Sequence, residues 1–222
     1  MAELEWDKAG ERYYENGVDH CALYPQDSTG TYPKGVAWNG ITSITESPDG
    51  AEANDIYADN MKYGSLRSTE TLGLTIEAYT YPDEFAVLDG TASPVKGVYL
   101  GQQKRGSFGL AFRTQIGNDT MTETDDGYKL HLIYGCTASP SERAYETIND
   151  SPDAISFSWE IDTTPVSVKG FKSVSNITVN SLDCDAEKLA ALEKILYGSD
   201  DVEARLPLPD EVLSILGYTA AA

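Results

Sequence analysis

Few residues of this sequence have the types and spacing that metal chemistry requires. The two histidines, His20 and His131, stand in no HExxH-like spacing, so the sequence indicates no ligand set for metal hydrolysis. The acidic pairs do not follow the DxDxDG pattern of a calcium loop, and we interpret them as solvated turns or helix caps. These pairs are Asp125-Asp126, Asp183/Asp185 and Asp200-Asp201. We therefore expect no metal site and no cofactor.

The segment 101–106, Gly-Gln-Gln-Lys-Arg-Gly, has the GxxxxG spacing of a phosphate loop. A phosphate loop continues with Lys and then Ser or Thr, whereas Ser107 and Phe108 follow here. We interpret the segment as a loop between strands. No GxSxG elbow occurs, and abundant carboxylates do not by themselves indicate a glycosidase. Since no motif supports catalysis, we expect a protein that is not an enzyme.

The charge of the chain is strongly acidic, with 36 acidic and 16 basic side chains and a formal net charge of −20. Proteins that bind nucleic acids or anionic membranes place Lys and Arg on phosphates, so this composition argues against both classes. The first residues lack the features of a secretory signal, and no stretch approaches the roughly 20 apolar residues of a membrane span. We expect synthesis in the cytosol, and reduced cysteines at positions 21, 136 and 184.

Alternation of apolar and polar residues dominates from about residue 18 to 180 and predicts half-buried antiparallel strands. The clearest case is 155–161, where every second residue is Ile, Phe or Trp, so that one face is expected to be core. The segments 108–112 and 130–134 alternate in the same way, and we expect them to pair. Further strands are predicted at 36–46, 71–79, 95–100, 143–148, 166–172 and 174–181. Turns are predicted at Asp49-Gly50, Asp89-Gly90 and Asp126-Gly127.

Three segments carry helical signals. Segment 82–88 begins with proline and two acidic residues, which suit a helix N-terminus. Segment 185–197 has leucine and isoleucine at helical spacing and is followed by Gly198 as a stop. A last short helix is expected over 209–216.

Together these patterns predict a mainly β fold. We expect an antiparallel β-sandwich or partial barrel with one short flanking helix, a long extended arm and a C-terminal helical appendage. Residues 1–181 are assigned to the β-sandwich domain, with the arm at about 46–66, and residues 182–222 to the appendage.

The arm is the least usual part of the sequence, because the segment 46–63 is too polar for a pair of core strands. Long excursions of this kind are commonly either disordered or functional, and spaced aromatic residues favour docking over a mobile surface loop. Both interpretations stay open at this point. The residues expected to form a subunit interface are Glu52, Asp55, Ile56, Tyr57, Asp59, Met61 and Tyr63.

A series of motifs along nearly the whole chain follows a recognisable order. The motifs are Val36-Ala-Trp-Asn-Gly-Ile41, the arm from Asp49 to Asp59, Leu74-Thr-Ile-Glu-Ala-Tyr79, Pro82-Asp-Glu-Phe85, the run from Arg113 to Gly135, Phe157-Ser-Trp-Glu160, Leu189 to Gly198 and Leu206-Pro-Leu-Pro209. In this order the chain resembles the major tail tube proteins of bacteriophages with long, flexible, non-contractile tails. Each motif is a structural pattern rather than a catalytic fingerprint.

The resemblance implies hexameric rings that stack into a tube through which genomic DNA passes without specific binding. It implies as partners the chain itself, a tape-measure protein inside the tube, tail terminator proteins and distal tail or baseplate proteins. It also implies a place in the virion tail, after assembly in the host cytoplasm. The arm would contact neighbouring subunits or the next ring, and ring closure would remove exposed sheet edges. Acidic walls would let DNA slide.

Two other functions stay open. A carbohydrate-binding β-sandwich module would use aromatic platforms, for which the support is 14 tyrosines together with Trp6, Trp38 and Trp159. Trp159 is expected to lie in the core, which weakens this alternative. A β hydrolase would rest on the abundant carboxylates alone.

Overall fold

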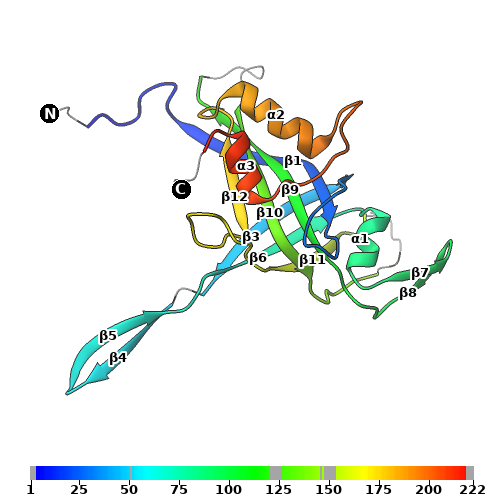
Figure 1. Cartoon of the computed structure of the whole chain (residues 1–222), viewed down its shortest axis with the longest axis horizontal. Coiled ribbons are helices and arrows are strands. Elements are labelled where there is room, and N and C mark those ends of the chain that lie inside the picture. Colours follow the sequence, from blue (N-terminus) through cyan, green and yellow to red (C-terminus); the bar gives the residue numbers. More distant parts are fainter. Residues whose placement is uncertain (1–3, 51, 121–126, 146, 148–153, 219–222) are drawn as a thin grey trace.

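The chain folds around one large antiparallel sheet (Figure 1). The computed structural model describes residues 4–50, 52–120, 127–145, 147 and 154–218. The strands of the sheet are β1 (Tyr13–Pro25), β2 (Val36–Ala37), β3 (Ile41–Asp49), β6 (Thr71–Ala78), β9 (Ser107–Asn118), β10 (Gly127–Ala138), β11 (Phe157–Thr163) and β12 (Asn176–Asn180). Their order is β2-β1-β9-β10-β11-β6-β3, and β12 also pairs with β10. The predicted mainly β, antiparallel fold is confirmed.

The sheet curls over a first hydrophobic core. β1 and β3 are not neighbours in the strand order, yet they lie in contact, so the sheet forms a sandwich or partial barrel. In β11, Trp159 and Ile161 are buried whereas Glu160 is exposed, which confirms the alternation predicted there. Ile155 lies outside the strand and is 41% exposed, so its assignment to the core face was wrong.

A short helix, α1 (Asp83–Leu88), closes one end of this core, as predicted. Its Phe85 is fully buried, with its ring centroid 4.3 Å from that of Trp38 and 5.1 Å from that of Trp159. Trp38 Nε1 donates a hydrogen bond of 2.9 Å to the carbonyl oxygen of Thr80. Both tryptophans are therefore structural parts of the interior.

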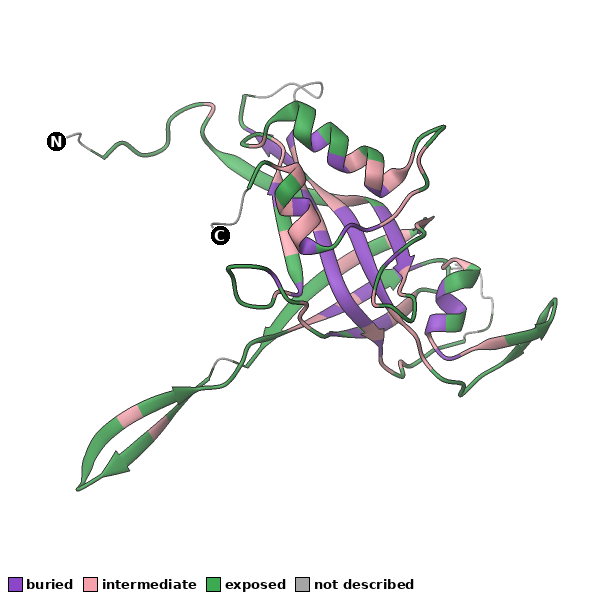
Figure 2. Ribbon diagram, viewed as in Figure 1, coloured by how far each residue is buried: buried purple, intermediate pink, exposed green. Residues whose placement is uncertain are grey.

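A second hydrophobic core lies on the outer face of β9 and β10, which are largely buried on both faces (Figure 2). The helices α2 (Ala186–Tyr197) and α3 (Pro209–Ile215) cover this face, with Leu192 and Val212 fully buried. Asp185 caps α2, because its side chain accepts hydrogen bonds from the backbone amides of residues 187 and 188. Among the described residues, no helix has the length and apolar character needed to cross a membrane.

The strand predictions hold for the long alternating segments and fail for several short ones. Segments 108–112 and 130–134 pair as expected within β9 and β10. The predicted strand 36–46 is broken before Ile41, because Gly40 adopts a φ of +80°. Segment 166–172 contains one isolated bridge, from Val166 to Val174, and the described residues of 143–148 are in no strand. The predicted strand 174–181 shortens to β12.

Of the three predicted aspartate-glycine turns, the one at Asp89-Gly90 is confirmed, whereas Asp49 ends β3 and Gly50 is in no turn, so that prediction was wrong. Gly50 has a φ of +88° and Gly90 a φ of +81°, values that favour glycine. At Gly50 a Cβ would lie 2.5 Å from the carbonyl oxygen of Thr69, so a side chain is also excluded by space. Asp126 of the third turn lies outside the described residues.

Candidate assembly surfaces

The predicted arm is a β-hairpin that projects from the body of the protein (Figure 1). It consists of β4 (Ala53–Ala58) and β5 (Met61–Arg67) in antiparallel register. At its tip Asp59 and Asn60 have φ values of 51° and 62°. Two left-handed residues between paired strands match the right-handed twist of a hairpin, so the sequence Asp-Asn ends the excursion in a tight turn.

All seven residues predicted for the interface lie on this hairpin or directly before it. Glu52 precedes β4, Asp59 is in the turn, and the others lie on the strands. The large side chains are exposed: Tyr57 is 69%, Met61 69% and Tyr63 78% exposed. Leu66, at 61%, is a further exposed apolar side chain of this hairpin, and it was not among the predicted interface residues because they ended at position 63.

The hairpin has one apolar and one polar face. Residues directly opposite each other in an antiparallel pair point to the same side. Ile56 faces Gly64 and Ala58 faces Met61, and Leu66 lies on this same side. On the other side Asp55 faces Ser65 and Tyr57 faces Lys62. We call the side that carries Ile56, Met61 and Leu66 the apolar face of the hairpin.

An ion pair stabilises the polar face. Lys62 Nζ lies 2.8 Å from Asp55 Oδ2, and this contact, followed by a hydrogen bond from Ser65, lowers the pKa of the Asp55 carboxyl. Figure 2 shows both hairpin strands as almost wholly exposed ribbon. Since no element of the described chain covers the apolar face, the hairpin keeps an amphipathic character without a core of its own.

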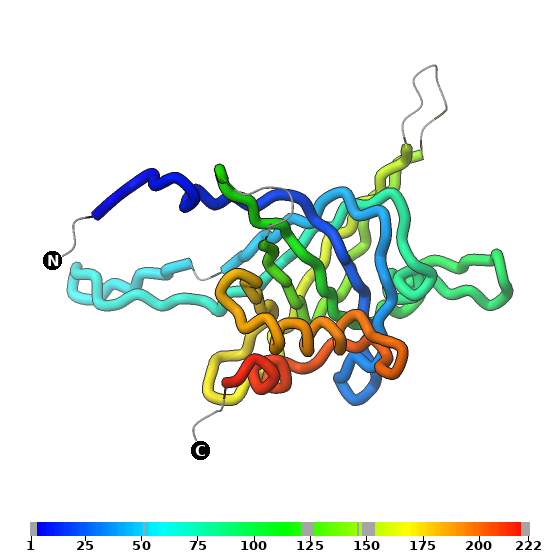
Figure 3. The backbone as a smooth tube through the Cα atoms, turned by 90° about the horizontal axis from the view of Figure 1, so that it is seen from above, coloured from blue at the N-terminus to red at the C-terminus, as the bar shows by residue number. Residues whose placement is uncertain are grey.

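A second hairpin projects from the other end of the molecule. It is formed by β7 (Ala92–Val95) and β8 (Val98–Leu100), and Figures 1 and 3 both place it opposite the β4–β5 hairpin along the long axis. Val95 is 65% and Tyr99 61% exposed. We predicted one strand over 95–100, and this was wrong: Lys96-Gly97, with a φ of +83° at the glycine, is a two-residue turn. The Lys-Gly dipeptide between Val95 and Val98 is the turn signal that the sequence prediction missed.

Two arginines fix the base of the second hairpin. Arg143 Nη2 donates to Asp89 Oδ2 at 2.7 Å, and Arg105 Nη2 lies 3.5 Å from Asp89 Oδ1. The Asp89 side chain is only 8% exposed, so these contacts are shielded from water more than a surface ion pair is. They hold the end of α1, the segment after β8 and the segment after β10 together.

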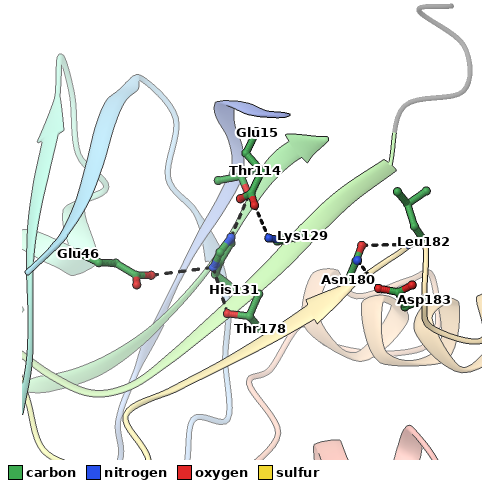
Figure 4. A network of polar contacts seen from close by, with 9 residues as sticks. All are labelled: Glu15, Glu46, Thr114, Lys129, His131, Thr178, Asn180, Leu182 and Asp183. Atoms are coloured by element: carbon green, nitrogen blue, oxygen red, sulfur yellow. Dashed lines mark hydrogen bonds and ion pairs between the residues drawn. The ribbon is translucent and has the colours of Figure 1, made fainter. Parts of the chain in front are cut away.

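A polar network lies where the first hairpin leaves the body (Figure 4). His131 of β10 accepts or donates a hydrogen bond of 2.9 Å with Thr114 Oγ1, and its ring stacks on Phe112. Its other nitrogen lies 3.9 Å from Glu46 Oε1. Burial lowers the pKa of His131, and burial raises the pKa of Glu46. His131 thus has a structural role, linking β10 to the strand that leads into the arm.

Next to this network lies a groove of about 390 Å³ with an aromatic rim. Tyr13 and Tyr14 of β1 line it, and the ring of Tyr14 lies over Gly117, where a Cβ would come within 2.7 Å of it. The polar lining includes Glu15, Lys129 and Asn180. Glu15 and Lys129 form an ion pair, and the hydrogen bond from Lys129 is the main cause that lowers the pKa of Glu15.

The other residues considered for chemistry are not assembled into a site. His20 is exposed and contacts Asp19 at 2.8 Å. Cys21 and Cys136 are buried, and burial raises the pKa of the Cys21 thiol to about 12, so it is not a reactive thiolate. Within the described residues, no three His, Cys, Asp or Glu side chains are grouped so that they could hold a metal ion.

No protein-family model matches the sequence, and no curated protein matches it. The geometry of the two hairpins and the order of the sequence motifs are therefore the basis for a functional proposal.

Proposed function

We propose that this protein is a structural subunit that assembles with copies of itself into hexameric rings stacked as a phage tail tube. The single observation that supports this most is the β4–β5 hairpin. The apolar face of this hairpin is exposed, and nothing in the described chain covers it. Exposed apolar surface of this kind commonly marks an interface with another protein.

The positions of the two hairpins favour a cyclic or helical assembly over a symmetric dimer. A two-fold dimer uses the same patch on both subunits, whereas two different patches on opposite sides give head-to-tail contacts that close into rings or continue as filaments. The β4–β5 and β7–β8 hairpins extend in opposite directions (Figures 1 and 3). Six copies per ring is the number that the resemblance to tail tube proteins implies.

The net charge of −20 fits a conduit for DNA. DNA carries about one negative charge per 1.7 Å of its axis, so a basic wall would bind it. Acidic side chains within a Debye length of about 8–10 Å would instead keep it moving. The same charge makes subunits repel one another, which means that assembly requires local contacts strong enough to offset this repulsion.

The remaining partners of the proposal come from the resemblance alone. They are a tape-measure protein inside the tube, a tail terminator at one end, and distal tail or baseplate proteins at the other. In this proposal the protein resides in the virion tail after assembly in the host cytoplasm. The proposal requires no catalytic residue, because a tube wall acts through its shape.

Electron microscopy of the purified full-length chain over a range of concentrations tests the proposal. Stacked rings or tubes are the expected result, with mass photometry used to count subunits in the smallest closed species. A chain that stays monomeric from micromolar to millimolar concentration, in both low and moderate salt, would overturn the proposal.

One observation supports the alternative of a carbohydrate-binding module. Tyr13 and Tyr14 form an aromatic rim beside the carboxylate of Glu15 and the amide of Asn180, a combination that suits sugar rings and hydroxyls. Trp38 and Trp159 are buried and offer no platform. Titration calorimetry with oligosaccharides separates the two functions, since binding that is lost in Y13A/Y14A, by a chain that does not assemble, would favour the sugar module.

A further inference from the structure

We infer that the β7–β8 hairpin is the docking surface for the β4–β5 hairpin of the next copy of this chain. The inference rests on the proposed self-assembly and names the two surfaces that make the contact. It follows from the charge, the exposure and the position of the two hairpins.

The first hairpin is slightly acidic, whereas the second hairpin and the segment that follows it are basic. Segment 52–67, which includes both strands of the first hairpin, contains Glu52, Asp55 and Asp59 against Lys62 and Arg67, a formal charge of −1. Segment 90–106 contains Lys96, Lys104 and Arg105 and no acidic residue, although acidic residues outnumber basic ones by 36 to 16 in the whole chain. Complementary charges of this kind orient two surfaces toward each other and exclude wrong pairings.

Contacts within the chain leave specific charges available on each side. Asp55 is engaged by Lys62, and Arg105 by Asp89. Lys96 and Lys104 are exposed, and across the described residues neither forms an ion pair within the chain. The exposed carboxylates of Glu52 and Asp59 have the same status on the first hairpin. Arg67 of β5 is likewise exposed and in no ion pair among the described residues, so these four residues and Arg67 are the hairpin charges available to an interface.

Both hairpins also expose apolar side chains between these charges. On the first hairpin they are Ile56, Met61 and Leu66 of the apolar face. On the second, Val95, Val98, Tyr99 and Leu100 are 65%, 48%, 61% and 49% exposed. A contact between the two hairpins would bury an apolar centre inside a charged rim, which is the usual anatomy of a specific protein interface.

The position of the hairpins makes the contact possible between copies and not within one. They lie at opposite ends of the molecule in both views (Figures 1 and 3), so one chain cannot bring them together without unfolding its sheet. The base of the β7–β8 hairpin is fixed by the contacts of Asp89 with two arginines. Each copy therefore carries both surfaces: the β7–β8 hairpin, which receives a neighbour, and the β4–β5 hairpin, which docks on the next copy.

Reciprocal charge reversal tests the inference. The variant E52K/D59K reverses two charges of the β4–β5 hairpin. The variant K96E/K104E reverses two charges at the β7–β8 hairpin, and both variants are made in the full-length chain. Matched controls with the same change in net charge are D200K/D201K and K34E/K194E, whose positions are exposed and outside both hairpins. Sedimentation velocity and mass photometry measure assembly of each variant alone and of the two hairpin variants mixed.

Each hairpin variant alone is expected to assemble at least roughly tenfold more weakly than its matched control, because like charges then face each other. The mixture is expected to recover assembly, since each kind of subunit then offers the charge that the other lacks. If wild-type chain assembles while both hairpin variants behave as their controls, the inference is overturned and the proposed function stands. Failure of the wild-type chain to assemble at all would overturn the proposed function itself.

Discussion

His131 Nδ1 lies 3.9 Å from Glu46 Oε1, and this contact joins the central strand β10 to β3, the strand that leads into the β4–β5 hairpin. Thr114 and Thr178 also contact the two nitrogens of the ring, at 2.9 and 3.4 Å. The histidine therefore lies at the polar end of the barrel interior, where the base of the projecting hairpin is held. Its protonation state affects the region that the proposed assembly depends on.

We expect stability to fall as the pH drops below the ordinary pKa of histidine. Burial is the main cause that lowers the pKa of His131 from 6.5, with Glu15 acting against it and Lys129 adding to it. Below pH 6.5 the unfolded chain therefore takes up a proton that the folded chain does not, and stability is lost until the lowered pKa is reached. Above 6.5 this contribution is fully present.

The variant H131Q isolates this effect, since glutamine keeps a polar side chain that does not titrate. Urea unfolding between pH 7.5 and 6.0 is expected to show a steeper loss of unfolding free energy in the wild type than in H131Q. Glu46, whose pKa is raised by burial, contributes with the opposite sign, but it is present in both proteins, so the comparison of the two slopes isolates His131. Equal slopes in the two proteins would contradict the assigned role.

Replacing the apolar face of the β4–β5 hairpin should abolish assembly while sparing the fold. In I56S/M61S/L66S the lost apolar area is exposed in the monomer, so the unfolding free energy of the monomer is expected to stay within about 0.5 kcal/mol of wild type. Electron microscopy and sedimentation measure assembly, and urea unfolding measures stability. The variant S65A/R67Q changes the opposite face and serves as the control; tubes formed equally by both variants would remove the apolar face from the interface.

The hairpin should also be ordered more firmly in the assembly than in the free chain. A two-stranded hairpin without a packed face is marginal in water. Backbone amides of β4 and β5 are expected to exchange with deuterium rapidly in the monomer and more slowly, by roughly tenfold or more, in tubes. Amides of β9 and β10, buried in both states, provide the internal reference. Unchanged exchange in β4 and β5 on assembly would show that another surface makes the contact.

The parts of the fold that the sequence predicted best are those in which one face is buried. Trp159 and Ile161 in β11 alternate cleanly because that strand has one core face and one wet face. The pairing of β9 with β10 was also predicted, although both strands are covered on two sides. The arm was identified through its polarity, because a segment without buried positions lacks the apolar residues of a core strand.

The predictions failed where tertiary contacts decide the outcome. Val166 and Val168 read as a strand, yet only one bridge forms there and no strand pairs along it. That β4 and β5 form a hairpin depends on the turn at Asp59-Asn60, a weaker signal than Asn-Gly. The basic composition of segment 90–106 was visible in the sequence, but the placement of the two hairpins at opposite ends of the molecule needed the structure.

Removal of one buried side chain in α2 should destabilise the whole chain. Leu192 is fully buried between the helix and the sheet, so L192A is expected to cost about 2–5 kcal/mol of unfolding free energy. Because α2 and the strands share one hydrophobic cluster, circular dichroism and tryptophan fluorescence should follow a single transition. L4A, at a residue that is 73% exposed, is the control and should change little. Two separate transitions would show that residues 182–222 behave as an independent unit.

Salt should affect assembly in two opposite ways. The two effects can be told apart because they act at different salt concentrations. Repulsion from a net charge of −20 per subunit acts over long distances and is screened once the Debye length falls to about 8–10 Å, near 0.1–0.15 M. The contact pairs inferred between Lys96 or Lys104 and the carboxylates of a neighbouring subunit would act over shorter distances, so we expect them to persist at that ionic strength.

Assembly is therefore expected to strengthen from low to moderate salt, or on addition of millimolar Mg²⁺, which neutralises surplus carboxylates. Toward 1 M, where the Debye length is about 3 Å, the contact pairs are screened as well, and the gain should level off or reverse. Light scattering across a NaCl series measures this, with K96E/K104E as the comparison, since that variant has no such pairs to lose and should show no decline at high salt. Assembly of the wild type that is the same from low to moderate salt would mean that net repulsion does not limit it, because the interfaces would then already neutralise the acidic surplus.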